Sequence, residues 1–217
     1  VPARDRLHRA VGTGKTSLLR AGLVPRLAGL GIRAIYLPSR PDSRATLIAA
    51  LDGGAADLTA ALAGWQRRDG GRVVVILDQI EAALTGGSTD GEPDALALAR
   101  ELLALDAGAD DDDAVAVVLS VREDFLGRLL AADERLRAGV PVLRLPPLDR
   151  AGARAVITEA LTEQRIGIDA ALLDALLDDL QAAARAIGPE MGWESGPSIS
   201  PPPLQLACSV LYESLDA

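Results

Sequence analysis

The sequence predicts an α/β protein in which a parallel sheet is followed by a small helical subdomain. Two aliphatic runs, Arg72–Asp78 and Ala114–Val121, alternate with stretches whose apolar residues recur at helical spacing. Unbroken β-branched runs are typical of parallel strands, because helices cover both faces of such a sheet. After Leu148 only helical patterns follow. We therefore expect an α/β core at residues 1–148 and a helical subdomain at residues 149–217.

The core elements follow one another in a strand–helix order. A helix from Lys15 to Leu30, kinked at Pro25, precedes a short buried strand at Ile32–Leu37. Residues 140–148, Val-Pro-Val-Leu-Arg-Leu-Pro-Pro-Leu, are predicted as a last short strand that ends at the two prolines. Helical spacing predicts further helices within residues 40–54, 58–68, 94–105 and 122–139.

The last third of the chain is predicted to be helical. The expected helices are Asp149–Gln164, Asp169–Ile187 and Leu204–Leu215, with a loop rich in Gly, Pro and Ser before the last one. The aspartate run at residues 110–113 is interpreted as a solvated turn and not as a metal cluster, because adjacent exposed aspartates are usually solvated.

Composition excludes several classes of partner. The net charge of −9 disfavours nucleic acid, because a phosphate backbone needs a basic surface. The single cysteine, Cys208, excludes an internal disulfide and fits a reducing compartment. No apolar run is long enough to span a bilayer, and the N-terminus does not resemble a signal peptide. We expect a cytoplasmic chain that binds neither nucleic acid nor a membrane.

A phosphate-binding loop is predicted at Gly12-Thr13-Gly14-Lys15-Thr16. Its backbone N–H groups and the following helix N-terminus form a cradle for an anion, Lys15 reaches β- and γ-phosphates, and the Thr16 hydroxyl can ligate Mg²⁺. Of the 22 basic residues this is the only lysine, and the other 21 are arginine. A compact ammonium fits such a loop better than a planar guanidinium does, although a lysine retained there by chance is the alternative.

Three charged residues at predicted strand ends complete the candidate site. Asp78 ends the strongest strand and can hold Mg²⁺, or it is simply a polar strand terminus. Glu81 can activate the attacking water, or it is a carboxylate at a helix start. Arg122 follows the next strand and can sense a γ-phosphate, or it pairs at the surface with Glu123 or Asp124.

These residues lie in blocks that resemble the bacterial STAND ATPases, which are signal-transduction ATPases with numerous domains. The nearest branch is the novel STAND domain, often found beside WD-repeat propellers. The resemblance spans about Gly12 to Tyr212, and its most specific blocks are Asp-Gln-x-Glu at residues 78–81 and Arg-x-Asp-Phe at residues 122–125. The other matching blocks are GTGKTSLLRAGLVPRL, RPDSRATLIAAL, LRLPPLDRAGARAVI and PPPLQLACSVLYE.

The resemblance implies a P-loop NTPase that binds ATP or ADP with Mg²⁺ and hydrolyses ATP weakly. It makes Asp78 the Mg²⁺-associated acid, Glu81 a water activator and Arg122 the first sensor. It also places Pro203 near the adenine, although three successive prolines can simply end a loop. In such a switch ADP holds a closed state, and ATP opens it toward oligomerisation and effector activation. The family usually has a second acid after Glu81, where Ala82 stands here.

Two departures from the family pattern bear on nucleotide binding. Arg9 occupies the position of the leading glycine of the motif, where a backbone tolerant of positive φ is wanted. The preceding segment, VPARDRLHR, does not read as the buried strand that leads into the loop in this fold. Either that strand is degenerate or absent, or the sequence omits residues near Arg9, and its absence predicts poor nucleotide affinity. The short length after the helical subdomain suggests a fragment of a longer protein with sensor or effector domains.

Two other functions remain open at this point. A degenerate fold that no longer hydrolyses nucleotide and serves as a scaffold for protein contacts is favoured by Arg9 and the weak first strand. A metabolic kinase is the least favoured class, because no acceptor-activating site is evident beside the phosphate loop.

Overall fold

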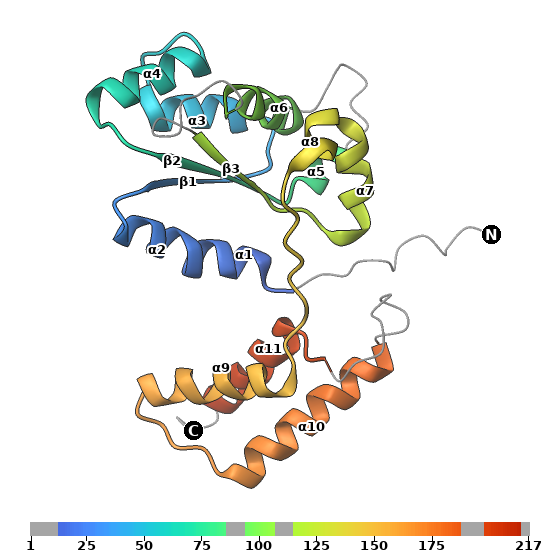
Figure 1. The fold of residues 1–217 in the computed structure, drawn as a ribbon. Helices are drawn as coiled ribbons and strands as arrows, with labels where there is room; N and C mark the ends of the chain where they lie inside the picture. The colour runs from blue at the N-terminus through green and yellow to red at the C-terminus, as the bar shows by residue number, and fades with distance from the viewer. Residues whose placement is uncertain (1–12, 86–93, 107–114, 188–197, 214–217) are drawn as a thin grey trace, which may run out of the picture. The chain divides into compact units, whose positions relative to one another are not determined.

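The computed structural model describes residues 13–85, 94–106, 115–187 and 198–213 (Figure 1). The chain divides into two compact units. Residues 16–142 form the α/β unit, and residues 143–217, with which the residues up to Lys15 are grouped, form the helical unit. Each unit has its own hydrophobic core. The order of an α/β core followed by helices is confirmed, whereas the boundary at Leu148 stays a prediction.

The described part of the α/β unit contains a parallel sheet. Its strands are β1 (Arg33–Pro38), β2 (Val73–Asp78) and β3 (Val115–Leu119), in the spatial order β1-β2-β3. Every residue of the central strand β2 is buried, as its unbroken aliphatic run predicts. Pro38 is the register partner of Asp78, so the carboxyl ends of β1 and β2 meet at one edge of the sheet.

Helices α3 (Ser43–Asp52), α4 (Leu58–Arg68) and α6 (Asp94–Asp106) cover one face of the sheet (Figure 1). The side chain of Asp57 caps α4 by accepting a hydrogen bond from the N–H of Ala60. The sheet presents Val73, Val75 and Leu77 of β2 to these helices. The largest helical side chains packed there are Leu47, Leu51, Leu58, Trp65, Leu98 and Leu102.

The other face of the sheet is covered by the helical segment after the phosphate loop. It consists of α1 (Lys15–Ser17), a π-helical turn η1 (Leu18–Leu23) and α2 (Val24–Gly29) (Figure 1). Within it Leu19 packs against Val74 and Ile76, the β2 residues that alternate with those facing the first layer.

The predicted kink at Pro25 takes the form of a change in helix type. Pro25 is the second residue of α2, which continues directly from η1. The N–H of Val24 reaches back to the carbonyl of Leu19, five residues earlier, as in a π-helix. The extra residue in this turn lets the chain continue as a helix across the proline.

Three short helices follow the carboxyl ends of β2 and β3. They are α5 (Glu81–Thr85), α7 (Glu123–Ala132) and α8 (Glu134–Gly139). The helical pattern predicted at residues 122–139 is therefore divided in two, because Asp133 has extended backbone angles.

The strand predicted at residues 140–148 is wrong. No strand lies there, and Val142 and Leu143 are exposed by 53% and 89%. Three of the nine residues are prolines, which cannot donate hydrogen bonds to a neighbouring strand. Within residues 140–148 the one β-type pairing is the antiparallel bridge from Leu148 to Ile199. The Val and Leu content suggested a strand. The three prolines leave too few backbone N–H donors for this segment to pair as one.

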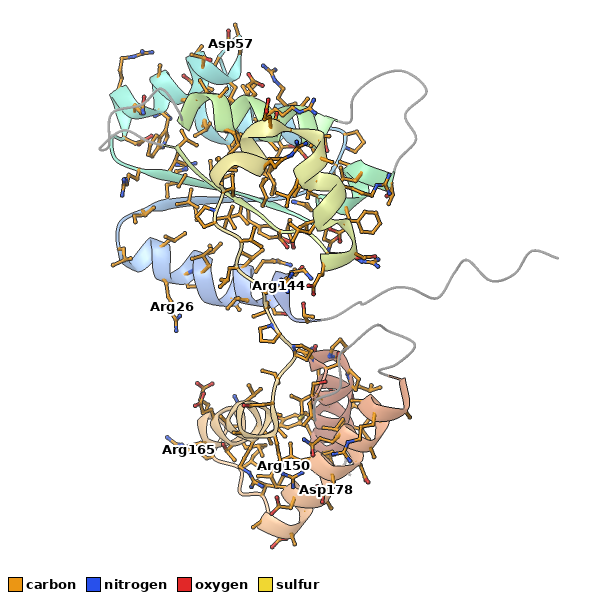
Figure 2. All side chains as sticks on the ribbon, turned by 45° about the vertical axis from the view of Figure 1, so that its right-hand side comes forward. Arg26, Asp57, Arg144, Arg150, Arg165 and Asp178 are labelled. Carbon is orange, nitrogen blue, oxygen red and sulfur yellow. The ribbon has the colours of Figure 1, made fainter. Side chains whose placement is uncertain are left out.

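The helical unit consists of α9 (Arg150–Glu163), α10 (Ala170–Ile187) and α11 (Pro201–Glu213) in its described residues. The Asp149 side chain caps α9 by accepting from the N–H of Gly152. Arg150 on α9 forms ion pairs with Asp174 and Asp178 on α10, and Figure 2 shows Arg150 and Asp178 directed toward each other. The core of this unit is built from Ala153, Ile157, Leu173, Leu177, Leu180, Ile199 and Leu204.

Candidate functional site

The carboxylate of Asp78 is the centre of the candidate site. Asp78 ends β2 and is 1% exposed. Its Oδ2 accepts two hydrogen bonds, one from the Thr16 hydroxyl at 2.6 Å and one from the Tyr36 hydroxyl at 2.7 Å. Its Oδ1 accepts the backbone N–H of Gln79 at 3.0 Å. The structure thus joins the strand-end acid to Thr16, the threonine of the predicted phosphate-binding loop, while the roles of both side chains toward a metal stay predictions.

These donors keep Asp78 ionised. Burial by itself raises the pKa of this carboxyl, but the hydroxyls of Ser120, Thr16 and Tyr36 and the N–H of Gln79 outweigh burial and hold the pKa below its ordinary value of 3.8. The Ser120 hydroxyl is buried and makes no hydrogen bond of normal geometry, so we assign its effect on the carboxylate to the nearby dipole and not to a formed bond. A negative charge is therefore available at neutral pH.

The described part of the phosphate loop has the backbone that its glycine predicts. Gly14 has a φ of +81°, a left-handed conformation that residues with a Cβ rarely adopt. Lys15 begins α1, and its Nζ donates to the Thr13 hydroxyl at 3.2 Å. Gly12 and Arg9 lie outside the described residues, so their predicted roles in the loop stay predictions.

The oxygen atoms gathered here fit Mg²⁺. This ion is usually bound through one or two carboxylates, a few waters and the phosphates of the substrate, and not by a cage of protein ligands. The Thr16 hydroxyl and the Asp78 carboxylate supply such a partial set 2.6 Å apart. No group of three or more His, Cys, Asp or Glu side chains suited to a metal occurs in the described ranges.

Glu81 ties two strand ends together. Gln79 has a φ of +60°, which turns the chain sharply out of β2 into α5. After this turn the N–H of Ile80 donates to the carbonyl of Ser120 at 3.0 Å. The Glu81 carboxylate accepts the backbone N–H of Arg122 at 3.2 Å. Glu81 therefore lies at the same edge as Asp78, but one of its oxygens is engaged in a structural hydrogen bond.

Arg122 makes a local ion pair. Its Nε donates to Asp124 Oδ1 at 3.1 Å and its Nη2 to Asp124 Oδ2 at 2.6 Å. The guanidinium also lies over the Phe125 ring, 5.3 Å from the ring centre. The pairing with Asp124 is the alternative that the sequence left open, and a role toward a γ-phosphate stays a prediction.

Pro203 lies in the first turn of α11 and is exposed. This helix begins at Pro201, three residues before the predicted start, because prolines are well tolerated in a first turn. Its predicted place beside an adenine stays a prediction.

Tyr36 is the site residue that sequence reasoning missed. It lies on β1 with its ring on the sheet face that carries Val74 and packs against Leu19 of η1, and the Arg20 guanidinium lies over that ring, 5.5 Å from its centre. Burial, followed by the hydrogen bond to Asp78, raises the pKa of Tyr36 to about 12. The sequence offered one indication of this contact. Tyr36 has a hydroxyl and lies near the end of β1, the strand that pairs with the strand ending in Asp78.

Comparison with known proteins identifies the family. Residues 7–188 match the family model described as Novel STAND NTPase 1. The chain belongs to this family. The match covers the phosphate loop, the strand that ends in Asp78, and the first two helices of the helical unit. The STAND resemblance suggested by the sequence blocks is thereby confirmed, and the α/β sheet with its site belongs to a nucleotide-binding NTPase domain.

A solved structure supports the same fold for this STAND domain. The ADP form of the Aeropyrum pernix ORC2 protein aligns with a TM-score of 0.53 at 15% sequence identity. The alignment covers 94% of this chain and 60% of that chain, so the STAND domain spans less than two thirds of the ORC2 protein. No curated protein matches the chain. Among the helices of the described ranges, none is long and apolar enough to cross a membrane.

Proposed function

We propose that this STAND domain is a regulatory switch that binds ATP or ADP with Mg²⁺ and hydrolyses ATP slowly. The observation that supports this function most directly is the 2.6 Å hydrogen bond between Thr16 and Asp78. It joins the hydroxyl of the phosphate loop to the strand-end carboxylate, which is the pairing that a shared metal needs. Gly12, Thr13 and Gly14 complete the loop.

In the proposed ATP hydrolysis each side chain of the site has a separate role. Lys15 neutralises charge on the β- and γ-phosphates, and Thr16 and Asp78 would hold Mg²⁺, which would supply further positive charge beside the phosphate oxygens. Glu81 orients the attacking water, and Arg122 senses the γ-phosphate. Both of these side chains are already engaged, since Glu81 accepts an N–H and Arg122 pairs with Asp124. Hydrolysis then requires these contacts to rearrange, which favours a slow turnover.

The switch itself is proposed from the family. ADP stabilises a closed state, and ATP shifts the population toward a state that oligomerises and activates an effector. By the same family resemblance, the helical subdomain predicted at residues 149–217 is lid-like and Pro203 is its candidate residue for the adenine. The partners are other domains of a longer cytoplasmic chain, and the occupant of the site is a nucleotide and not a nucleic acid.

A thermal-shift experiment tests nucleotide binding. Mg-ADP and Mg-ATP are expected to raise the melting temperature of the wild-type chain, because a ligand of the native state stabilises it. Lys15→Ala is expected to lose most of this shift. Arg26→Ala is a matched control, since Arg26 is an exposed basic residue on α2 and its removal changes the charge equally. Equal shifts in the wild type and in Lys15→Ala, or no shift in either, would contradict the proposal.

A scaffold that binds without hydrolysis is the second candidate. The bond from the Arg122 N–H to Glu81 and the pairing of Arg122 with Asp124 favour this function. They give Glu81 and Arg122 structural roles that do not depend on hydrolysis. The two functions differ in ATP turnover. Turnover that disappears in Asp78→Asn excludes the scaffold, whereas tight nucleotide binding with no turnover favours it.

A further inference from the structure

One oxygen of the metal-associated acid is saturated by donors. Asp78 Oδ2 accepts the Thr16 hydroxyl and the Tyr36 hydroxyl, and a carboxylate oxygen has two lone pairs. Oδ1 accepts the N–H of Gln79, and the buried Ser120 hydroxyl acts on the carboxylate without a hydrogen bond of normal geometry. The rotation of this buried carboxylate is therefore fixed by three donors from three different segments of the chain.

The Tyr36 donor is itself held in place. Its ring packs in the cluster that contains Leu19, Val74 and Ile76, and the Arg20 guanidinium lies over it, 5.5 Å from the ring centre. Arg20 comes from η1, the turn that follows the phosphate loop. The stack of Arg20 on Tyr36 therefore connects the helix after the loop to the strand-end acid, in addition to the direct bond from Thr16.

We propose that Tyr36 is a positioning residue of the metal–nucleotide site, which fixes Asp78 so that only its Oδ1 faces the metal and its waters. This inference rests on the proposed function. Thr16 is not assigned this task alone, because its hydroxyl oxygen is also a prospective Mg²⁺ ligand. Tyr36 is not a prospective ligand, so its bond to Oδ2 persists whether or not the metal is present. The Tyr36 hydroxyl therefore increases the gain in ADP affinity that Mg²⁺ provides. It contributes little to ADP affinity in the absence of the metal.

The test separates metal coupling from nucleotide binding. The dissociation constant for ADP is measured by calorimetry with Mg²⁺ and with a chelator, and the ratio of the two constants is the coupling. In Tyr36→Phe the ring stays and only the hydroxyl is lost. We expect the constant with chelator to be unchanged and the coupling to fall roughly fivefold, equal to about 1 kcal/mol at 1.4 kcal/mol per tenfold.

Three reference proteins complete the experiment. Tyr212→Phe is the matched control, because Tyr212 is the only other tyrosine and is 49% exposed on α11. It is expected to leave both constants unchanged. Asp78→Asn is expected to lose most of the coupling, and Arg20→Gln a smaller part of it than Tyr36→Phe does. A general loss of folded protein cancels in the ratio, because both constants are scaled by the same folded fraction.

The outcomes distinguish the two proposals. If the wild type binds ADP with metal coupling and Tyr36→Phe keeps the full ratio, or has a larger one, the positioning role is refuted while the nucleotide function stands. If the wild type binds no ADP in either condition, both are refuted. A fall of the ratio in Tyr36→Phe but not in Tyr212→Phe supports the positioning role.

Discussion

Replacing Thr16 with valine removes one oxygen from the centre of the site. Valine keeps the branched shape and a similar helix propensity, so the loss is confined to the hydroxyl that donates to Asp78 Oδ2 at 2.6 Å. Hydrogen bonds to charged groups contribute about 1.5–3 kcal/mol. Asp78 keeps the donors Tyr36 and Gln79, so we expect the lower end, about 1.5 kcal/mol, or roughly a tenfold fall in the folding equilibrium constant.

The stability difference between the wild type and Thr16→Val is also expected to depend on pH. The pKa of Asp78 is lower in the folded chain than the ordinary 3.8, so its donors stabilise the fold at a pH above that value. This extra stabilisation is lost as the pH falls through the folded pKa, because a protonated acid accepts hydrogen bonds more weakly than a carboxylate does. The difference between wild type and Thr16→Val is therefore constant above about pH 5 and becomes smaller at a pH well below 3.8.

Urea unfolding measures both quantities. Trp65 is 3% exposed in the α/β unit, and in a Trp193→Phe background it is the sole tryptophan, so its fluorescence follows this unit. Thr16→Ser is the matched control, since serine keeps the hydroxyl. The reasoning fails if Thr16→Val is as stable as the wild type at neutral pH, or if Thr16→Ser loses as much stability as Thr16→Val does.

Three further expectations address other parts of the chain. In Tyr212→Phe, whose only tyrosine is Tyr36, tyrosinate absorbance is expected to rise with a pKa of about 12, and a midpoint near the ordinary 10.0 would contradict the Asp78 contact. Leu177→Ala empties a fully buried position of the helical unit and is expected to cost about 2–5 kcal/mol in urea unfolding, with a cost under about 1 kcal/mol contradicting that core. Gly14→Ala is expected to weaken ADP binding in calorimetry through a strain of about 1–2 kcal/mol, unlike Gly29→Ala in α2, and equal affinities would contradict the left-handed loop.

The placement of Asp78 beside Thr16 could be predicted from the sequence. An unbroken aliphatic run fixes a buried parallel strand, and its first polar residue then lies at the carboxyl edge. A Gly-Lys-Thr turn leading into a helix is expected to meet that edge, because helices that follow such loops cover the sheet. Each pattern can be recognised from neighbouring residues. The contact between Thr16 and Asp78 then follows because the fold class brings both patterns to the same edge of the sheet.

The role of Tyr36 could not be predicted in the same way. A tyrosine in a strand usually packs by its ring, and nothing local indicates that its hydroxyl will find an acid on the next strand. The contact depends on register, which places Tyr36 opposite Ile76 and Pro38 opposite Asp78. Register is set by the packed faces of the whole sheet and not by either strand.

Two other sequence interpretations show how short-range chemistry decides an outcome. Arg122 pairs with Asp124, only two residues away, so the local ion pair is present without any ligand. Residues 140–148 have the apolar content of a strand, but their prolines remove the backbone donors that a ladder requires. For residues 140–148 the backbone excludes the strand that the side chains suggested, whereas for Arg122 the nearest charge explains the ion pair and the sensor role stays a prediction.

The bond from the Arg122 N–H to Glu81 has a consequence for recognising active members of this family by sequence. A carboxylate that accepts a backbone N–H between neighbouring strand ends stabilises this edge of the sheet whether or not ATP is cleaved. We therefore expect its loss to lower stability as well as any turnover. The presence of an acid at position 81 therefore does not by itself indicate that a chain hydrolyses ATP. That activity has to be judged from other residues.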